Sequence, residues 1–411
     1  MARSAEATAI EGSTGLTDAS QTAAPPVPLS ARLDRVGVVV ALIAIVGMDW
    51  QPFATLKPNR LVSGEGLSLG GSLPTLWAAI GIGVLSLATI VAVLRTRAWL
   101  RLATGVASLL VLALLIGIVP AHVVPAENSF ARVSPAAGFW LMALAFAVLT
   151  TDAVAKLKLG PFARLGLLAA GAIATALILG SGHWDGLSIL KEYATNAGKF
   201  WREGAQHIRL AIGSLAAAIV VGLPLGIACH RNATLRGITL PVLNIIQTVP
   251  SMAMYGLMIV PLSLFAASFP IAAALGIRGI GTAPALIALF LYSLLPVVAN
   301  TVVGLGEVRR SVVEAAEGMG MTRHQRLFQV ELPLALPVIL TGIRIVLVQN
   351  IGLVTIAALI GGGGFGTFVF QGIGQAATDL VLLGAVPTIA LAFTAAVLLD
   401  AIIELSERRR L

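Results

Sequence analysis

The residues that could do covalent chemistry are few and scattered. Cys229 is the single cysteine, which excludes an intramolecular disulfide and a cysteine-cluster metal site. The five histidines lack metal-ligand spacing, and the sequence contains neither H-E-x-x-H nor the phosphate-binding G-x-x-x-x-G-K-[ST] pattern. We therefore expect no catalytic residues, no metal site and no cofactor on this chain. Without that phosphate-binding pattern the chain cannot itself hydrolyse ATP through such a loop.

One glycine run, at positions 361–366, formally contains G-x-G-x-x-G. It is a poor nucleotide fingerprint, because no predicted strand precedes it. A backbone turn or part of an outer gate is the better interpretation, with Gly363 and Gly364 as gate candidates.

The most informative polar pattern lies at 307–337, between two long apolar stretches. Ser311 followed by Glu314 predicts a capping box, in which the hydroxyl accepts from a backbone N–H and the carboxylate reaches back. Thr322 followed by Gln325 predicts a second one. The local chemistry therefore predicts two short helices.

A turn should separate these helices. Gly320 can adopt positive φ and end the first helix, and Pro333 is expected to break the second before the chain re-enters an apolar stretch. Small apolar residues such as Val312 and Ala316 give the first helix a surface suited to a groove of another protein. The alternative is an ordinary helical connector, and the residues alone favour neither.

Composition places the chain in a membrane. Of its 411 residues, 57% are hydrophobic and 11% are charged, whereas soluble domains carry about 25% charged residues. A soluble protein with so few charges could not cover its surface. The net charge of +8 would suggest nucleic acid in a soluble protein, but here the placement of the charges matters more, and we expect no nucleic-acid partner.

About ten stretches are apolar enough to cross a ~30 Å hydrocarbon core as helices. They are 36–50, 73–94, 103–124, 139–155, 165–179, 208–229, 238–265, 283–305, 336–360 and 380–405. The predicted fold class is an all-α polytopic membrane protein with about ten transmembrane helices.

Basic residues then orient the spans, because cytoplasmic loops carry an excess of Lys and Arg. They concentrate in alternate loops, at Arg95, Arg97, Arg101, Lys156, Lys158, Arg164, Arg231, Arg236, Arg309, Arg310, Arg323 and Arg326. This pattern predicts a multi-pass protein of the bacterial inner membrane with both termini in the cytoplasm.

The chain divides into five parts. Residues 1–33 read as a disordered cytoplasmic tail, 34–182 as an N-terminal five-span region, and 207–405 as a C-terminal five-span core. Between them, 183–206 carries aromatic and charged residues at helical spacing, which predicts a periplasmic interfacial helix or linker. Residues 406–411 form a basic cytoplasmic tail.

Two features inside the predicted spans have functional interpretations. Pro250 lies within the seventh span, flanked by Gln247, Thr248 and Ser251, and predicts a kinked helix that lines a pore. The alternative is a packing kink without contact to solute. Arg344 lies within the ninth span, close enough to its inner end for an interfacial or structural role.

The 307–337 loop carries a recognisable pattern. Glu314-Ala315-Ala316, then Gly320, then after nine residues Val330-Glu331-Leu332-Pro333, resembles the EAA loop of ATP-binding-cassette (ABC) importer permeases. The resemblance implies a C-terminal five-helix permease core whose loop inserts into a cleft of the ATPase subunit and transmits its closure to the channel. It also implies which residues form the coupling element: Glu314, Ala315, Ala316, Gly320, Leu332 and Pro333.

A narrower resemblance covers about 207–399. The phrases at 222–226 and 246–251 resemble the osmoprotectant branch of these permeases, which handles glycine betaine, choline and proline betaine. The N-terminal half, with the phrase at 58–66, resembles the longer Yeh-type permeases of that branch.

The resemblance implies a permease subunit that works with a cytosolic ATPase, a periplasmic solute-binding protein and a second permease copy or paralogue. Because quaternary ammonium is usually recognised by aromatic cages and the chain has only three tyrosines, we expect the binding protein to select the solute. An amino-acid permease is the alternative within the class. An ion-coupled secondary transporter is the alternative outside it, although the candidate carboxylates lie near span ends.

Overall fold

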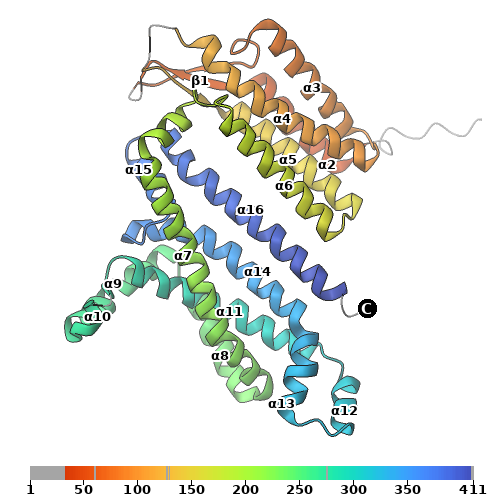
Figure 1. The fold of residues 1–411 in the computed structure, drawn as a ribbon, viewed down its shortest axis with the longest axis vertical. Helices are drawn as coiled ribbons and strands as arrows, with labels where there is room; N and C mark the ends of the chain where they lie inside the picture. The colour runs from red at the N-terminus through yellow and green to blue at the C-terminus, as the bar shows by residue number, and fades with distance from the viewer. Residues whose placement is uncertain (1–32, 60–61, 126–127, 129, 275, 409–411) are drawn as a thin grey trace, which may run out of the picture.

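The computed structural model describes residues 33–59, 62–125, 128, 130–274 and 276–408 (Figure 1). The tail expected at 1–33 therefore lies outside the described residues except for Leu33, and so do the last three positions of the tail expected at 406–411. Within the described ranges, nine helices are long and apolar enough to cross a membrane. This confirms an all-α polytopic membrane protein.

The N-terminal bundle contains helices and a small sheet. Its elements are α2 (Arg35–Ile45), a π-helical turn η1 (Val46–Trp50), β1 (Ala54–Lys57), β2 (Glu65–Leu67), α3 (Thr75–Val93), α4 (Ala98–Val123), β3 (Arg132–Pro135), α5 (Ala137–Leu157) and α6 (Pro161–Gly180).

Two features of this bundle differ from expectation. The first predicted span is only the short α2 extended by η1, and it is not among the nine spanning candidates. The sequence analysis also missed the antiparallel sheet, whose order is β2-β1-β3 with Thr55 opposite both Gly66 and Ser134. Three- and four-residue strands are too short to show an alternating pattern.

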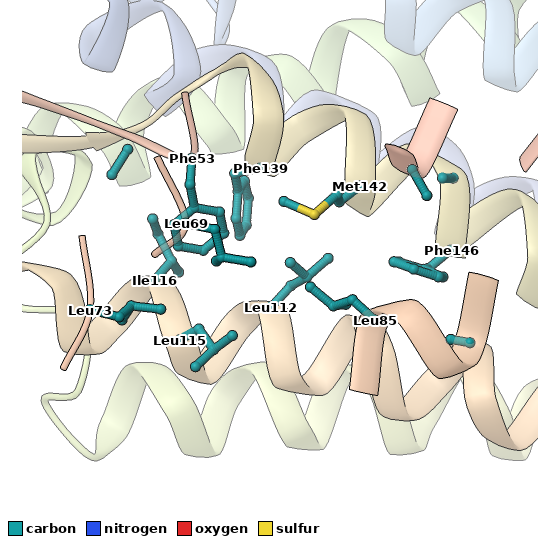
Figure 2. Close-up of a cluster of buried hydrophobic side chains, with 14 of the residues drawn as sticks. Phe53, Leu69, Leu73, Leu85, Leu112, Leu115, Ile116, Phe139, Met142 and Phe146 are labelled. Atoms are coloured by element: carbon teal, nitrogen blue, oxygen red, sulfur yellow. The ribbon is translucent and has the colours of Figure 1, made fainter. Parts of the chain in front are cut away.

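The interior of the N-terminal bundle is apolar and aromatic. Phe53, just before β1, packs edge-on against Phe139 at the start of α5, with 5.9 Å between ring centroids. Figure 2 shows Leu112 of α4 and Met142 of α5 pointing toward each other in the same cluster, both fully buried. This core holds the bundle together, and Ile189, at the start of the helix that follows the bundle, packs against it.

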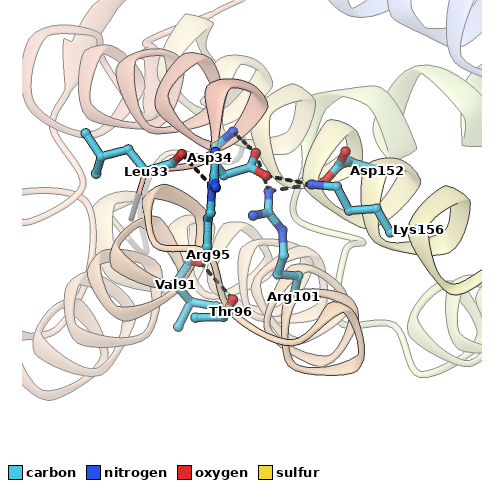
Figure 3. A network of polar contacts seen from close by, with 9 residues as sticks. Leu33, Asp34, Val91, Arg95, Thr96, Arg101, Asp152 and Lys156 are labelled. Atoms are coloured by element: carbon cyan, nitrogen blue, oxygen red, sulfur yellow. Dashed lines mark hydrogen bonds and ion pairs between the residues drawn. The ribbon is translucent and has the colours of Figure 1, made fainter. Parts of the chain in front are cut away.

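An ion-pair cluster closes one end of that bundle (Figure 3). The guanidinium Nη2 of Arg101, a residue that is 1% exposed, lies 3.2 Å from Asp34 and 3.1 Å from Asp152. Lys156 Nζ lies 2.7 Å and 2.8 Å from the same two carboxylates. Burial by itself would raise the pKa of Asp34, but the hydrogen bonds from Lys156 and the Gly37 amide and the charge of Arg101 lower it to about 2.

The C-terminal core follows. Its elements are α7 (Ser188–Arg231), α8 (Ala233–Thr248), α9 (Ser251–Ser268), α10 (Pro270–Ala274), α11 (Thr282–Gly306), α12 (Arg310–Gly318), α13 (Arg323–Arg326), a π-helical turn η2 (Leu327–Glu331), α14 (Leu332–Ala357), a 3-10 turn η3 (Ala358–Ile360), α15 (Gly366–Gly374) and α16 (Thr378–Arg408).

A buried polar contact pins three of these helices together. Asn350 of α14 donates to Ser214 of α7 at 2.8 Å and to Ser293 of α11 at 2.9 Å, and all three residues are fully buried. In a hydrocarbon environment such hydrogen bonds fix which helix faces meet.

The separate interfacial helix expected at 183–206 is wrong. Most of that segment belongs to α7, a single helix of 44 residues that continues into the sixth predicted span. At 1.5 Å per residue it is about 66 Å long, roughly twice a ~30 Å hydrocarbon core. The polar N-terminal part of α7 therefore extends the span beyond the membrane, along the side of the protein in Figure 1.

Candidate functional site

The predicted helix–turn–helix between α11 and α14 is present. The first helix, α12, ends in a glycine turn in which the Gly320 amide donates to Glu317 O at 2.9 Å and the Met321 amide to Ala316 O at 3.1 Å. Gly320 has φ of 80°, as expected. This bond pattern is a Schellman motif, which satisfies carbonyls that a helix end leaves unpaired.

Of the two predicted capping boxes, one is confirmed. Thr322 accepts from the Gln325 amide, and the Gln325 side chain accepts from the Thr322 amide at 2.9 Å. The Ser311–Glu314 box is wrong, because α12 begins two residues earlier than that box requires, with Arg309 as its N-cap and no side-chain cap. Glu314 instead accepts from Arg310 Nε at 2.9 Å, one helical turn away.

Pro333 does not break the second helix. Residues Arg323–Ile360 run as one helical stretch, with the π-helical turn η2 immediately before the proline. In η2 the Leu332 amide donates to Leu327 O, five residues back. A proline clashes with the carbonyl four residues back in a regular helix, and the widened turn removes that clash.

The residues of the expected coupling element occupy two faces of α12. Glu314 and Ala315 are exposed, whereas Ala316 is 2% exposed and faces the protein. Met319 and Phe328 add exposed apolar surface beside them, with 74% and 53% of each residue accessible. An exposed face of small and apolar residues backed by a buried alanine suits docking of a partner.

Leu332 and Pro333 have different roles from the exposed pair. Leu332 is half-buried and packs on a cluster formed by Leu305, Ala335 and Ile339, while Pro333 is exposed. They shape the base of the loop, where it joins α11 and α14. Figure 1 shows α12 and α13 projecting from one end of the core, the end at which α16 also finishes.

In place of the kinked helix expected around Pro250, the structure has two separate helices. Helix α8 ends at Thr248 and α9 begins at Ser251, with Pro250 as its N-cap. Tyr292 of α11 bridges the break, since its hydroxyl donates to Val249 O at 2.6 Å. Gln247 donates to the Tyr292 carbonyl oxygen at 3.3 Å.

The other pore candidates have distinct surroundings. Thr248 is exposed and donates to Ile245 O at 2.7 Å, one turn back in α8, and Ser251 is half-buried. The glycine run at 361–366 contacts α11 at its other end, where the Gly281 amide donates to Ile360 O at 2.8 Å. Residues 281 and 292 are about 16 Å apart along a helix, so the structure does not bring the two groups of candidates into one site.

The glycine run is a turn, as expected. Gly361, Gly363 and Gly364 have φ of 76°, 79° and 89°, conformations that residues with a Cβ rarely adopt. Side chains of α7 hold this turn, which the sequence did not reveal. Glu203 accepts from the Gly364 amide at 2.7 Å.

Sequence reasoning missed three ion pairs that shape the core. Arg344 of α14 lies 2.8 Å from Asp400 of α16, which supplies the partner that the sequence left open. Glu331, inside the recognised motif, pairs with Arg326 and Arg231. The charges themselves were the available signal, but Arg231 and Arg344 find their partners on segments far away in the sequence.

Comparison with known proteins places the chain in a family. Residues 218–411 match the binding-protein-dependent transport system inner membrane component family, and residues 34–190 match the N-terminal domain of the ABC transporter permease YehY. The glycine betaine/carnitine/choline transport system permease protein OpuCB of Bacillus subtilis is 34% identical over 215 residues, covering 52% of this chain and 90% of that protein. The chain belongs to the permease subunits of ABC importers.

Other similar proteins carry related names. The osmoprotectant import permease protein OsmW of Salmonella typhimurium is 41% identical over 190 residues, covering 46% of this permease and 83% of OsmW. Among solved structures, the inward-facing MetNI methionine ABC transporter covers 50% of this permease and 94% of its own chain, with a TM-score of 0.43 and 23% identity.

Membership fixes the biochemical class. The permease is the membrane subunit of an importer, a transport component and not an enzyme. Its family works with an ATPase and a solute-binding protein.

Proposed function

We propose that this permease imports quaternary ammonium osmoprotectants such as glycine betaine, choline and carnitine. The observation that carries the solute class is that relatives 34% to 41% identical to the C-terminal half are named for these solutes or for osmoprotectants in general. The local chemistry of the loop around α12 supports ATP-driven coupling. An amino-acid permease remains the alternative solute class, and an ion-coupled carrier the alternative mechanism.

The partners follow from the site. A cytosolic ATPase docks on the exposed face of α12, with Glu314, Ala315, Ala316, Gly320, Leu332 and Pro333 forming or shaping the contact. A periplasmic binding protein delivers the solute, and a second permease copy or paralogue completes the path. Gln247, Thr248, Pro250, Ser251, Gly363 and Gly364 are proposed to line that path or its gate, at two separate levels.

The solute proposal is tested by reconstituting the permease with its ATPase and binding protein in proteoliposomes. We expect ATP-dependent accumulation of radiolabelled choline, glycine betaine or carnitine, and none of methionine. Accumulation of an amino acid alone would refute the proposed solute class and support the amino-acid permease. Uptake that continues without ATP and collapses with the proton gradient would refute ATP-driven transport and support an ion-coupled carrier.

The proposed location is the bacterial inner membrane, with α12 and both termini in the cytoplasm. A cysteine introduced at Met319, 74% exposed beside α12, should react with an impermeant maleimide only in inside-out vesicles. A cysteine at Phe130, 76% exposed near the sheet, should react only in right-side-out vesicles. Cys229 is fully buried, so background labelling should be low, and the opposite pattern would reverse the orientation.

A further inference from the structure

A single buried carboxylate joins the loop around α12 to another helix of the core. Glu331, whose side chain is 4% exposed, accepts from Arg326 Nε at 2.9 Å through one oxygen and from Arg231 Nη2 at 2.6 Å through the other. Arg326 also pairs with Glu317 of α12. A chain of ion pairs therefore runs from α12 through the base of its loop to the last residue of α7.

This chain is a stiff connection. Charge-assisted hydrogen bonds are stronger than neutral ones. Screening is weak at the two central groups, Glu331 and Arg326, whose side chains are 4% and 9% exposed. The side chains of Arg231 and Glu317, at the two ends, are 39% and 56% exposed. Both oxygens of Glu331 are occupied by different arginines, so the carboxylate cannot turn toward one without releasing the other. A movement of α12 is thus passed to the end of α7 as well as to α14, to which its loop is covalently joined.

At the other end of the core portion of α7, side chains form hydrogen bonds with the glycine turn at 361–366. Glu203 accepts from the Gly364 amide at 2.7 Å and from the Thr367 hydroxyl at 3.3 Å. Gln206 donates to Gly362 O at 3.0 Å. The fully buried His207 accepts from the amide of Phe365 at 3.2 Å. One face of α7 therefore hydrogen-bonds the turn at residues 362, 364 and 365.

Helix α7 spans the distance between these two contacts. From residue 203 to residue 231 it rises about 42 Å, more than the thickness of a ~30 Å hydrocarbon core. Pro224 removes one backbone hydrogen bond inside this length. Gly222 and Gly226 flank it and lie so close to α11 that a Cβ would meet Val297 at 2.9 Å or Thr301 at 2.6 Å, and this packing braces the helix there.

We infer that α7 is a rod that couples the position of α12 to the glycine turn, with Arg231 and Glu331 as positioning residues at one end and Glu203 at the other. The inference rests on the proposed docking of an ATPase at α12. It gives the glycine turn two connections to that docking site, one through α14 and one through α7. Losing the α7 connection should leave ATP hydrolysis intact while fewer solute molecules enter per ATP.

Arg231→Gln is the decisive variant, because it cuts the connection to α7 while Glu331 keeps its bond to Arg326 and the loop around α12 keeps its shape. In the reconstituted transporter we measure ATP hydrolysis, solute uptake and co-purification of the ATPase. We expect normal co-purification and hydrolysis, with the ratio of solute to ATP lowered about fivefold, the size of a typical coupling contribution. Arg231→Lys, which keeps the charge, should recover most of the ratio.

Two further variants separate a rod from a local effect. Glu203→Ala, about 42 Å away along α7, should lower the same ratio with hydrolysis retained. Arg236→Gln removes an exposed arginine on α8, five positions from Arg231, and should leave the ratio unchanged. A wild-type ratio in Arg231→Gln, loss of ATPase binding in that variant, or a normal ratio in Glu203→Ala would each overturn the inference. Absence of ATP-dependent uptake by the wild-type transporter would instead overturn the proposed function.

Discussion

Replacing Gly320 by alanine should weaken the turn between α12 and α13 without any clash. Gly320 has φ of 80°, and a Cβ built there meets nothing within 4 Å. The cost therefore comes from backbone conformation alone, about 1–2 kcal/mol for an L-residue in the left-handed region. That energy lowers the ratio of formed to unformed turn by a factor of roughly 5–30.

Two matched variants isolate this cause. Gly320→Asn should cost less than Gly320→Ala, because asparagine is several-fold enriched in the left-handed region. Gly318→Ala changes a glycine two residues earlier that lies within α12 and also has open space around it. Since alanine is favoured over glycine by about 0.8–1 kcal/mol in a helix, this control should stabilise α12 or leave it unchanged.

The assay is solute uptake by the reconstituted transporter together with the amount of ATPase that co-purifies with the permease. We expect activity to fall in the order Gly318→Ala, Gly320→Asn, Gly320→Ala, with all three proteins inserted in the membrane. Wild-type uptake by Gly320→Ala would refute the reasoning. So would an asparagine variant as defective as the alanine variant, because side-chain volume rather than backbone conformation would then be responsible.

Four other substitutions, one with a matched control, test the rest of the structure. Arg101→Gln should lower the free energy of unfolding by up to about 3 kcal/mol, because it leaves two partly buried carboxylates with one lysine between them, and thermal unfolding in detergent measures it. The pKa of Asp34 is lowered from 3.8 to about 2, so the stability that its charge contributes should be complete above pH 4 and disappear only as the pH falls towards 2; Asp34→Asn should abolish that pH dependence. Gly366→Ala should reduce uptake, since its Cβ would lie 1.9 Å from a backbone oxygen of α14, whereas Gly374→Ala, with open space around it, should not. Tyr292→Phe should cost about 1 kcal/mol and speed amide hydrogen exchange at the break between α8 and α9; unchanged exchange would argue that the hydroxyl does not hold the break.

Local sequence predicted the local parts of the site. The glycine turn at Gly320 and the capping box at Thr322 depend on residues within five positions of each other, and both are present. The capping box at Ser311 is absent because α12 starts two residues earlier than predicted, which removes Ser311 from the N-cap position. The prediction that Pro333 ends the helix is wrong, because a π-helical turn before it removes the steric clash with the preceding turn.

The break at Pro250 shows the same limit for a span. The apolar run around it satisfied the hydropathy criterion as one helix, but the chain divides into α8 and α9 there. The partner that bridges the break, Tyr292, lies 43 residues from the Val249 carbonyl it binds. A hydropathy window has no access to a contact at that distance in sequence.

The sequence alone determined the membrane class, most of the spans and the position of the loop with its glycine turn, because each is encoded by composition or by residues a few positions apart. Tertiary structure decided which polar groups on different helices bind each other. Glu331 meets Arg231 across 100 positions, and Glu203 meets Gly364 across 161. A charge in a sequence does not specify its partner, since only the packing of helices determines which charged groups approach within hydrogen-bonding distance.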